Sequence, residues 1–208
     1  MDAFESLVAT LLRRDGYWIW PSFKVGLTKE DKVAIGKPSS PRWEIDLVAY
    51  KGSTNEVLAI ECKSYLDSGG VLFRKGVFDP PQRYKLFSDA RLRDVVLDRL
   101  VAQLQASGSC ALNPRRELWL VAGHVNGRTD RKAMDAHFTS NGWRLCDDGW
   151  VRERLIAASA AGYENDVAHV VAKLLLKKGS VAVAPASAAA RGNIVTGDVP
   201  RRTRRPAV

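Results

Sequence analysis

The stretch LAIECKSY (58–65) begins like a buried β-strand and ends in charged residues. An apolar run suited to a protein core leads directly into Glu61, Cys62 and Lys63. Because side chains alternate along a strand, Glu61 and Lys63 share one face and Cys62 points to the other. An unpaired acid beside a buried run is costly, so this strand end predicts either an ion pair or a reactive site.

The strand expected before it, WEIDLVAY (43–50), carries a second acid, Asp46. The polar segment KGSTN (51–55) has the length of a hairpin turn and joins the two strands. Regular alternation puts three apolar residues of the first strand on one face, namely Ile45, Leu47 and Ala49. A register that buries the apolar residues of both strands also brings Asp46 next to Glu61.

Two neighbouring carboxylates repel each other, and their proximity is costly unless a cation lies between them. Mg²⁺ fits this role because it prefers oxygen ligands, usually one or two carboxylates with waters and a phosphate oxygen. Such a metal polarises a phosphoryl oxygen and lowers the pKa of a bound water. Lys63 is suited to orient or deprotonate that water and to stabilise charge on the phosphorus. The pattern therefore predicts phosphodiester hydrolysis.

Asp46 followed across a hairpin by Glu61-Cys62-Lys63 resembles the PD-(D/E)xK superfamily of nucleases, also called restriction-endonuclease-like. Ile45 stands where that superfamily usually has proline. Many members, notably archaeal-type Holliday junction resolvases and related endonucleases, also carry a glutamate in the first helix, and Glu5 matches that position. The resemblance implies an α/β fold with an αβββαβ core, in which helices flank a central mixed sheet.

The resemblance also implies a role for each residue of the motif. Glu5, Asp46 and Glu61 would be metal ligands, the backbone carbonyl of Cys62 a further ligand, and Lys63 the catalytic lysine. The implied metal is Mg²⁺, with Mn²⁺ as a substitute, and the implied partner is duplex or branched DNA. Many relatives act as dimers, so a homodimer is one expectation, although no stretch of this sequence marks an interface.

Several residues near the motif are candidates for binding the nucleic-acid backbone: Lys63, Ser64, Arg74, Lys75, Arg83 and Lys85. A solvated turn is an equal alternative for the basic loop at 74–76. Some relatives carry a QxxxY motif on the next helix, but Gln82-Arg83-Tyr84 has the wrong spacing, so no such role is assigned.

The charge of the chain points in the same direction. It has 208 residues with 32 Lys and Arg against 23 Asp and Glu, a net charge of +9 and a pI near 9.7. A surplus of this kind favours a polyanionic partner, since each cation that neutralises a phosphate releases counterions. A basic surface that serves solubility is the alternative.

Other classes of protein are disfavoured by what the sequence lacks. It has neither an apolar run long enough to span a bilayer nor a basic amphipathic helix suited to a membrane surface. A Walker-type phosphate loop is also missing, so we expect no nucleotide cofactor. Three scattered cysteines predict reduced thiols in a cytoplasmic protein.

Hydrophobic periodicity predicts a single α/β domain over 1–178 and a flexible basic tail over 179–208. The expected helices are 2–14, two within 81–106, 129–140, 150–160 and 163–178. The expected strands are 17–25, where Pro21 suggests an edge, 43–50, 56–65, 117–123 and 142–148. The remaining segments are expected to be a loop over 26–41 and a loop or short hairpin over 68–81.

Together these patterns predict a metal-dependent DNA endonuclease. One alternative is a catalytically inactive DNA-binding module on the same fold, and another is an interaction subunit whose basic surface meets a protein. The simplest structural alternative is an exposed ion pair between Glu61 and Lys63, which would contribute little stability.

Overall fold

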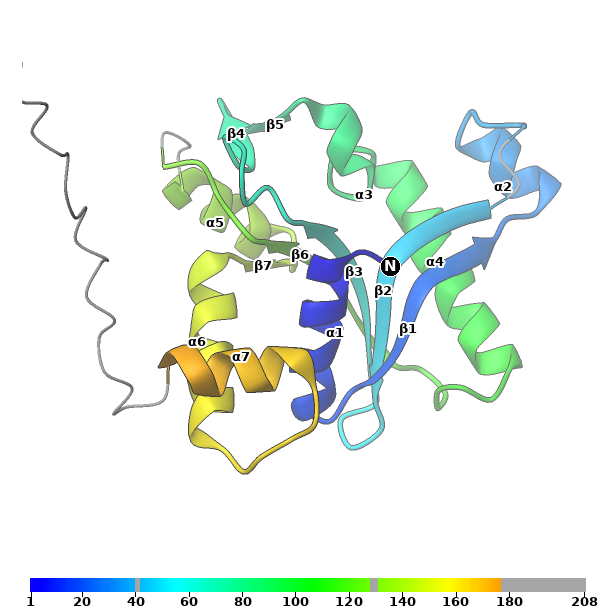
Figure 1. Ribbon diagram of the computed structural model, residues 1–208. Coiled ribbons are helices and arrows are strands. Elements are labelled where there is room, and N and C mark those ends of the chain that lie inside the picture. Colours follow the sequence, from blue (N-terminus) through cyan, green and yellow to red (C-terminus); the bar gives the residue numbers. More distant parts are fainter. Residues whose placement is uncertain (40–41, 128–130, 177–208) are drawn as a thin grey trace, which may run out of the picture. The chain divides into compact units, whose positions relative to one another are not determined.

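A mixed sheet of five strands, in the order β1-β2-β3-β6-β7, forms the centre of the molecule (Figure 1). The computed structural model describes residues 1–39, 42–127 and 131–176. The five strands are β1 (Trp18–Gly26), β2 (Arg42–Lys51), β3 (Glu56–Lys63), β6 (Arg115–Ala122) and β7 (Arg144–Cys146). β1 pairs antiparallel with β2 and β2 pairs antiparallel with β3, while β3, β6 and β7 are parallel to one another. The predicted hairpin and the α/β class are confirmed.

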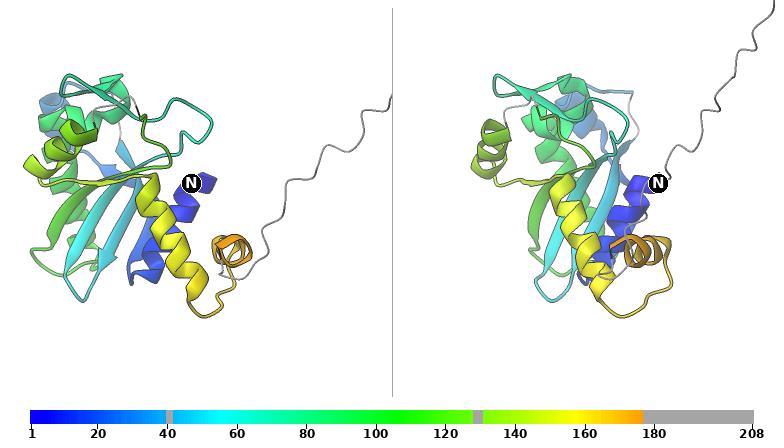
Figure 2. Two further views of the ribbon diagram at one scale, coloured as in Figure 1. Left: turned by 90° about the vertical axis from the view of Figure 1, so that its left-hand side faces the viewer. Right: turned by 60° about the vertical axis from the view of Figure 1, so that its left-hand side comes forward.

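Helices cover both faces of this sheet, as two further views show (Figure 2). They are α1 (Ala3–Arg14), α2 (Lys29–Ala34), α3 (Lys85–Ser88), α4 (Ala90–Ala106), α5 (Arg131–Ser140), α6 (Asp148–Ala160) and α7 (Val167–Leu176). A 3₁₀ turn, η1 (Pro81–Tyr84), precedes α3, and β4 (Leu72–Arg74) pairs with β5 (Val77–Asp79) in a separate small hairpin.

The two faces bury separate apolar clusters. On one face, side chains of α3, α4 and α5 pack on the sheet, among them Leu86, Val96 and Phe138. On the other face, Val8 of α1 and Val151 of α6 pack on the sheet. Burial of apolar side chains on both faces is the main stabilising contribution and fixes the register of the central strands.

The sheet divides at one end, and this division creates the candidate site. Pairing between β2 and β3 ends at Leu47 and Ile60. Beyond that point β2 continues in contact with β1 as far as Arg42, while β3 continues along β6 as far as Lys63. We call this opening the fork and define it by the four residues Asp46, Glu61, Cys62 and Lys63.

The strand alternation predicted for β2 is wrong at the fork. Leu47 and Ala49 lie in the cluster beneath α1, but Ile45 lies in the opposite cluster with Val48. Ser22 and Asp46 lie opposite each other at this point, and neither takes part in the regular pairing of β1 with β2. Ser22 has a φ of 48°, which marks a local distortion of the edge strand. The apolar residues therefore change faces at this point.

Most other boundaries follow the predictions, with one missed helix. The segment 26–41 was predicted as a loop, but Thr28 and Asp31 form a capping box that starts the short helix α2. Pro21 lies on the edge strand β1, as expected. The last strand is shorter than predicted because Asp147 caps α6, which ends the extended segment.

The described residues belong to one compact unit, and the predicted tail at 179–208 lies outside them. Across 1–39, 42–127 and 131–176, no helix combines the length and apolarity that a membrane crossing requires. All three cysteines are free thiols, and burial raises the pKa of Cys62 and Cys146.

Candidate active site in the fork of the sheet

Asp46 is held in the fork by the backbone of the neighbouring strand. Its Oδ2 accepts a hydrogen bond of 2.7 Å from the backbone N–H of Cys62. This contact lies beyond the last β2–β3 pair at Leu47 and Ile60. The carboxylate therefore continues the link between the two strands where the backbone ladder has ended, and it is positioned beside Glu61 and Lys63.

Lys63 lies between the two acids of the fork. Its Nζ is 3.4 Å from Glu61 Oε2 and 3.9 Å from Asp46 Oδ2. The side chain of Glu61 is 14% exposed and that of Lys63 is 20% exposed, so the ion pairs are shielded from water on most sides. The exposed ion pair considered from the sequence is therefore not what the structure contains.

Glu5 approaches the fork from α1, and it also stabilises the helix. Its Oε2 accepts from the backbone N–H of Asp2 at 3.1 Å, and Asp2 Oδ1 accepts from the N–H of Glu5 at 2.8 Å. This is a capping box, which the Asp-x-x-Glu spacing at 2–5 signals and which the sequence analysis missed. Burial raises the pKa of Glu5, and the charge of Asp46 adds to that increase.

The fork holds more negative charge than its one lysine offsets. Burial raises the pKa of Glu61 to about 7, and the charges of Asp46 and Glu5 act in the same direction. Burial would lower the pKa of Lys63, but the charges of Glu61 and Asp46 outweigh it and raise that pKa above its ordinary value. Lys63 is therefore protonated at neutral pH, which suits the stabilisation of an anionic oxygen better than proton abstraction.

The donor atoms of this site suit a hard divalent cation. The charge of Asp46 raises the pKa of both Glu5 and Glu61. Carboxylate oxygens gathered in this way fit Mg²⁺ or Mn²⁺. In the described part of the chain these three do not meet as a group with atoms within 4.8 Å of one another. The ammonium group of Lys63 contacts two of them instead.

The predicted backbone-binding residues fall in three places. Ser64 directly follows β3, and its carbonyl lies against Gly123, where an added Cβ would collide with it. Arg74 and Lys75 are exposed on the β4–β5 hairpin, where Arg74 pairs with Asp79 at 3.9 Å. The other two, Arg83 and Lys85, belong to η1 and the start of α3.

Tyr65 joins η1 to the fork, and nothing in the sequence marked it. The residue has a φ of 42°, an uncommon conformation for a bulky side chain. Burial would raise its pKa, but hydrogen bonds with Tyr84 and Arg83 outweigh burial and hold that pKa below its ordinary value. The charge of Lys63 contributes in the same direction. Arg83 is thus positioned close to the lysine of the fork.

A second group of possible metal ligands has a structural explanation. Glu164, Asp166 and His169 offer ligand atoms within 4.8 Å of one another. Arg14 Nη1 already donates to Glu164 Oε1 at 2.7 Å and to Nδ1 of His169 at 2.8 Å, while Asp166 Oδ1 accepts from the backbone N–H of His169. Arg14 thus pairs with Glu164 and His169 and attaches α7 to α1, while Asp166 accepts from the backbone at the start of α7.

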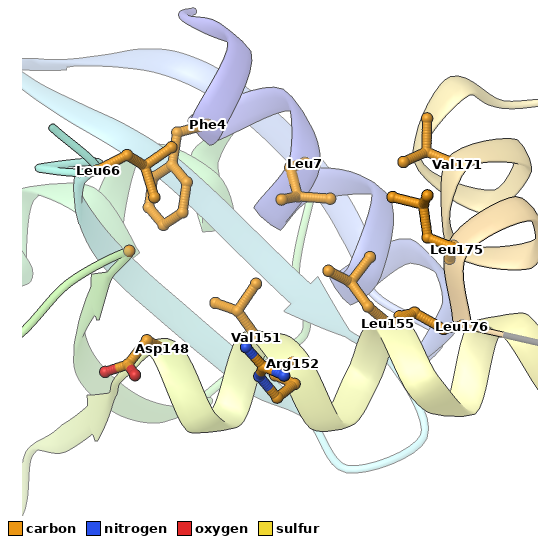
Figure 3. A pocket seen from close by; sticks show the side chains of 12 residues that line it. Phe4, Leu7, Leu66, Asp148, Val151, Arg152, Leu155, Val171, Leu175 and Leu176 are labelled. Atoms are coloured by element: carbon orange, nitrogen blue, oxygen red, sulfur yellow. The ribbon is translucent and has the colours of Figure 1, made fainter. Parts of the chain in front are cut away.

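An apolar pocket of about 400 Å³ lies between α1, α6 and α7 (Figure 3). Phe4 and Leu66 line one end of it, and Leu155 and Leu175 line the other. Asp148 and Arg152 are the charged side chains of the lining. This composition resembles a gap between packed helices more than a site for the hydrolysis of an anionic substrate.

The chain was compared with protein-family models, with curated proteins and with solved structures, and it matches none of them. The geometry of the fork is therefore the basis for a functional conclusion.

Proposed function

We propose that the protein is a metal-dependent DNA endonuclease with a restriction-endonuclease-like core. The observation that carries this proposal is the convergence of Asp46, Glu61 and Lys63 at a fork between two central strands. Apart from the short helix α2 after β1 and the β4–β5 hairpin after β3, the chain order is one helix, three antiparallel strands, further helices and a parallel strand. This order supports the αβββαβ core that the sequence resemblance implies.

A functional role for the fork explains why acids lie together there, an arrangement that a purely structural role would not favour. Glu61 is nearly buried, and its neighbours raise its proton affinity to a pKa of about 7. Clusters of this kind, in which burial and like charge perturb a carboxylate, are typical of functional sites. Asp46, Glu61 and Glu5 would hold the cation, with the Cys62 carbonyl as a further ligand.

When bound, a divalent metal polarises a phosphoryl oxygen and acidifies water. The chain's own contribution is electrostatic. Lys63 presents a protonated ammonium group beside the acids and can donate to a phosphate oxygen, which stabilises the negative charge that grows during hydrolysis. Arg83, positioned by Tyr65, is available to hold the neighbouring backbone.

A specific observation supports the alternative of a DNA-binding module without turnover. The ammonium group of Lys63 contacts both Asp46 and Glu61, so the lysine partly neutralises the acids that would hold a metal. In an inactive module this contact would persist in the presence of Mg²⁺. In an active enzyme the metal would compete with Lys63 for the carboxylates.

The test is a cleavage assay with supercoiled, linear and four-way-junction DNA, in Mg²⁺, Mn²⁺ or EDTA. We expect cleavage that requires the metal and is lost in Lys63→Ala and in Asp46→Asn. Asp94→Asn is a matched control, because Asp94 is 71% exposed on α4. Cleavage by the control but not by Asp46→Asn would assign the activity to the fork.

Binding to all three DNA forms without cleavage in either metal would favour the inactive module. Cleavage that survives Lys63→Ala and Asp46→Asn would show that the fork is not the active site.

A further inference from the structure

Helix α7 turns its large aliphatic side chains away from the rest of the protein. Its buried residues are only His169 and Ala172. Its exposed residues are all aliphatic, namely Val167, Val171, Leu174, Leu175 and Leu176. In a surface helix of a globular protein the apolar stripe normally faces the core, so the orientation of α7 is reversed. An outward aliphatic stripe of this kind marks a surface that another molecule covers.

The outward face of α7 carries no charge. Val167, Val171 and Leu174 follow a spacing of four and then three residues, which places them on one side of the helix. The one lysine of the helix, Lys173, donates from Nζ to two backbone carbonyls beside it, that of Ser159 at 3.2 Å and that of Ala161 at 2.6 Å. Its ammonium group is therefore turned toward the end of α6 and leaves the outward stripe entirely apolar.

A groove runs beside this stripe. The pocket of about 400 Å³ in Figure 3 shares Leu7, Leu155 and Val171 with a second cavity of about 500 Å³. Val171 and Leu175 of α7 lie across from Leu7 of α1, with Leu155 of α6 near them (Figure 3). We call the surface that lines both cavities the α7 groove. An apolar ridge and an apolar groove therefore lie next to each other.

The charges of the α7 groove do not suit a nucleic acid. Its charged lining residues are Asp148, Arg152 and Asp166, so acids outnumber bases. A phosphate backbone binds where cations are in excess, and it would find acids and aliphatic side chains here. The occupant must instead offer an aliphatic surface of its own.

A second copy of the chain offers such a surface, and the areas agree. Removal of one Val or Leu side chain from water corresponds to roughly 60–120 Å² of apolar area. Because the exposed fractions of the stripe amount to about three whole side chains, it offers about 200–400 Å². A stable interface buries about 800 Å² on each partner. The stripe alone is too small, so the α7 groove has to take part as well.

We infer that the stripe of α7 and the α7 groove form a self-complementary interface with a second copy of this chain. In a two-fold dimer the same surface is used by both copies, so the stripe of each copy lies in the α7 groove of the other. Each copy then buries ridge and groove together. The interface goes beyond the proposed function and requires neither DNA nor a metal.

The first test is the mass of the full chain in solution, measured by sedimentation velocity from about 1 to 100 µM in EDTA, a range of dissociation constants typical of weak to moderate association. We expect a species of twice the 22.9 kDa of the chain. Leu174→Glu should raise the dissociation constant of the dimer at least about 100-fold, because a two-fold interface contains the new charge twice. Leu174 is 67% exposed, so this change does not disturb the core.

Two further variants complete this test. Val167→Glu, at an 81% exposed position of the same stripe, should also weaken the dimer. Val33→Glu is the matched control, because Val33 is 72% exposed on α2, away from α7 (Figure 1). It should leave the dissociation constant unchanged. A monomeric wild-type protein over the whole range, or a dimer that survives Leu174→Glu and Val167→Glu, would overturn the inference.

A second test asks whether the two copies meet at α7 itself. Leu174→Glu and Leu174→Lys should each be mainly monomeric alone, and a mixture of the two should recover a dimer that contains one of each. Opposite charges on the two stripes attract, whereas like charges repel. Failure of the mixture to associate would mean that the two stripes do not face each other.

These measurements are distinguishable from a test of the nuclease, because EDTA prevents metal-dependent cleavage and no DNA is present. A dimer that never cleaves DNA would keep the interface and lose the proposed function. Sedimentation with vesicles of phosphatidylcholine and phosphatidylglycerol covers the other occupant of an aliphatic face. A monomer that binds these vesicles through Leu174 would assign the stripe to a lipid surface and contradict the dimer.

Discussion

Strand β3 carries a buried or nearly buried glutamate at each end, and the two ends differ in how the charge is balanced. Glu56, at the start, is 4% exposed and accepts a 2.7 Å hydrogen bond from the hydroxyl of Tyr17 and an ion pair from Arg115. Burial would raise the pKa of Glu56, but these partners outweigh burial and hold that pKa below its ordinary value.

Glu61, near the other end of the strand, has one lysine that it shares with Asp46, and its pKa is raised to about 7. The comparison shows that burial of an acid does not by itself identify a functional site. An acid whose charge is fully compensated by the chain stabilises the fold. An acid left under-compensated beside other acids is available to bind a cation.

The largest expected effect is on the rate of DNA cleavage, and it distinguishes Glu61 from Glu56. Glu61→Gln should reduce the rate of metal-dependent cleavage on the order of 10³-fold, because it removes a charged ligand from the fork. Glu56→Gln should leave the cleavage rate of the folded protein unchanged. The rates are compared by single-turnover assays on the same DNA. Equal losses in both variants would remove the functional distinction between the two ends.

The next effect is on the pH dependence of stability. Between pH 4.5 and about 7, the folded protein keeps a proton on Glu61 that the unfolded chain has released. The free energy of unfolding in EDTA should therefore fall as the pH rises through this window, on the order of 2–3 kcal/mol. Urea unfolding at several pH values measures this fall.

Two controls test whether this fall in the free energy of unfolding comes from Glu61. Glu61→Gln should flatten the profile, and Mg²⁺ should restore stability at pH 8, since a ligand that binds only the folded state stabilises it. The contribution of Glu56 has the opposite sign, because its lowered pKa favours the folded state above pH 4.5 and loses this effect as the pH falls. A wild-type profile that rises from pH 5 to 8 would contradict the assignment for Glu61.

A third prediction concerns the compensated end of the strand. Tyr17→Phe should lower the free energy of unfolding by about 2 kcal/mol, because it removes a hydrogen bond to a buried carboxylate. Tyr163→Phe is the matched control, since Tyr163 is 70% exposed and should show no change. Chemical denaturation measures both. We expect cleavage by the folded Tyr17→Phe protein to remain at the wild-type rate.

The smallest expected effect tests the cluster on α7. Asp166→Ala should cost about 1 kcal/mol of stability through the loss of the hydrogen bond to the N–H of His169, without any change in cleavage. Asp135→Ala, at an exposed position of α5, should alter neither quantity. Loss of metal-dependent cleavage in Asp166→Ala would mean that this cluster has a functional role after all.

Much of the architecture was predictable from local patterns. Alternating apolar residues and a polar turn predicted the β2–β3 hairpin, and the helical stripe predicted α4, because these signals depend on neighbours in the chain. The short helix α2 was missed because its signal is a capping box formed by Thr28 and Asp31, without an apolar stripe. The same kind of box at Asp2 and Glu5 was overlooked.

The candidate site was only partly predictable. Asp46, Glu61 and Lys63 were identified from strand alternation and do come together. The alternation argument was nevertheless wrong for Ile45, which lies on the opposite face from Leu47. The contacts of Tyr65 were not visible, because its partners Arg83 and Tyr84 are distant in the chain.

The sequence by itself determined the strands, the hairpin and the acids and lysine that the hairpin carries. These follow from side-chain periodicity and turn chemistry, which act over a few residues. Only the tertiary structure decided that β2 leaves β3 after Leu47, so that the Asp46 carboxylate meets the Cys62 N–H instead of the regular ladder continuing. It also decided which buried glutamate is compensated, since Tyr17 and Arg115 reach Glu56 from other parts of the chain. Charge balance in a folded protein depends on distances between remote residues, and no local pattern in the sequence contains them.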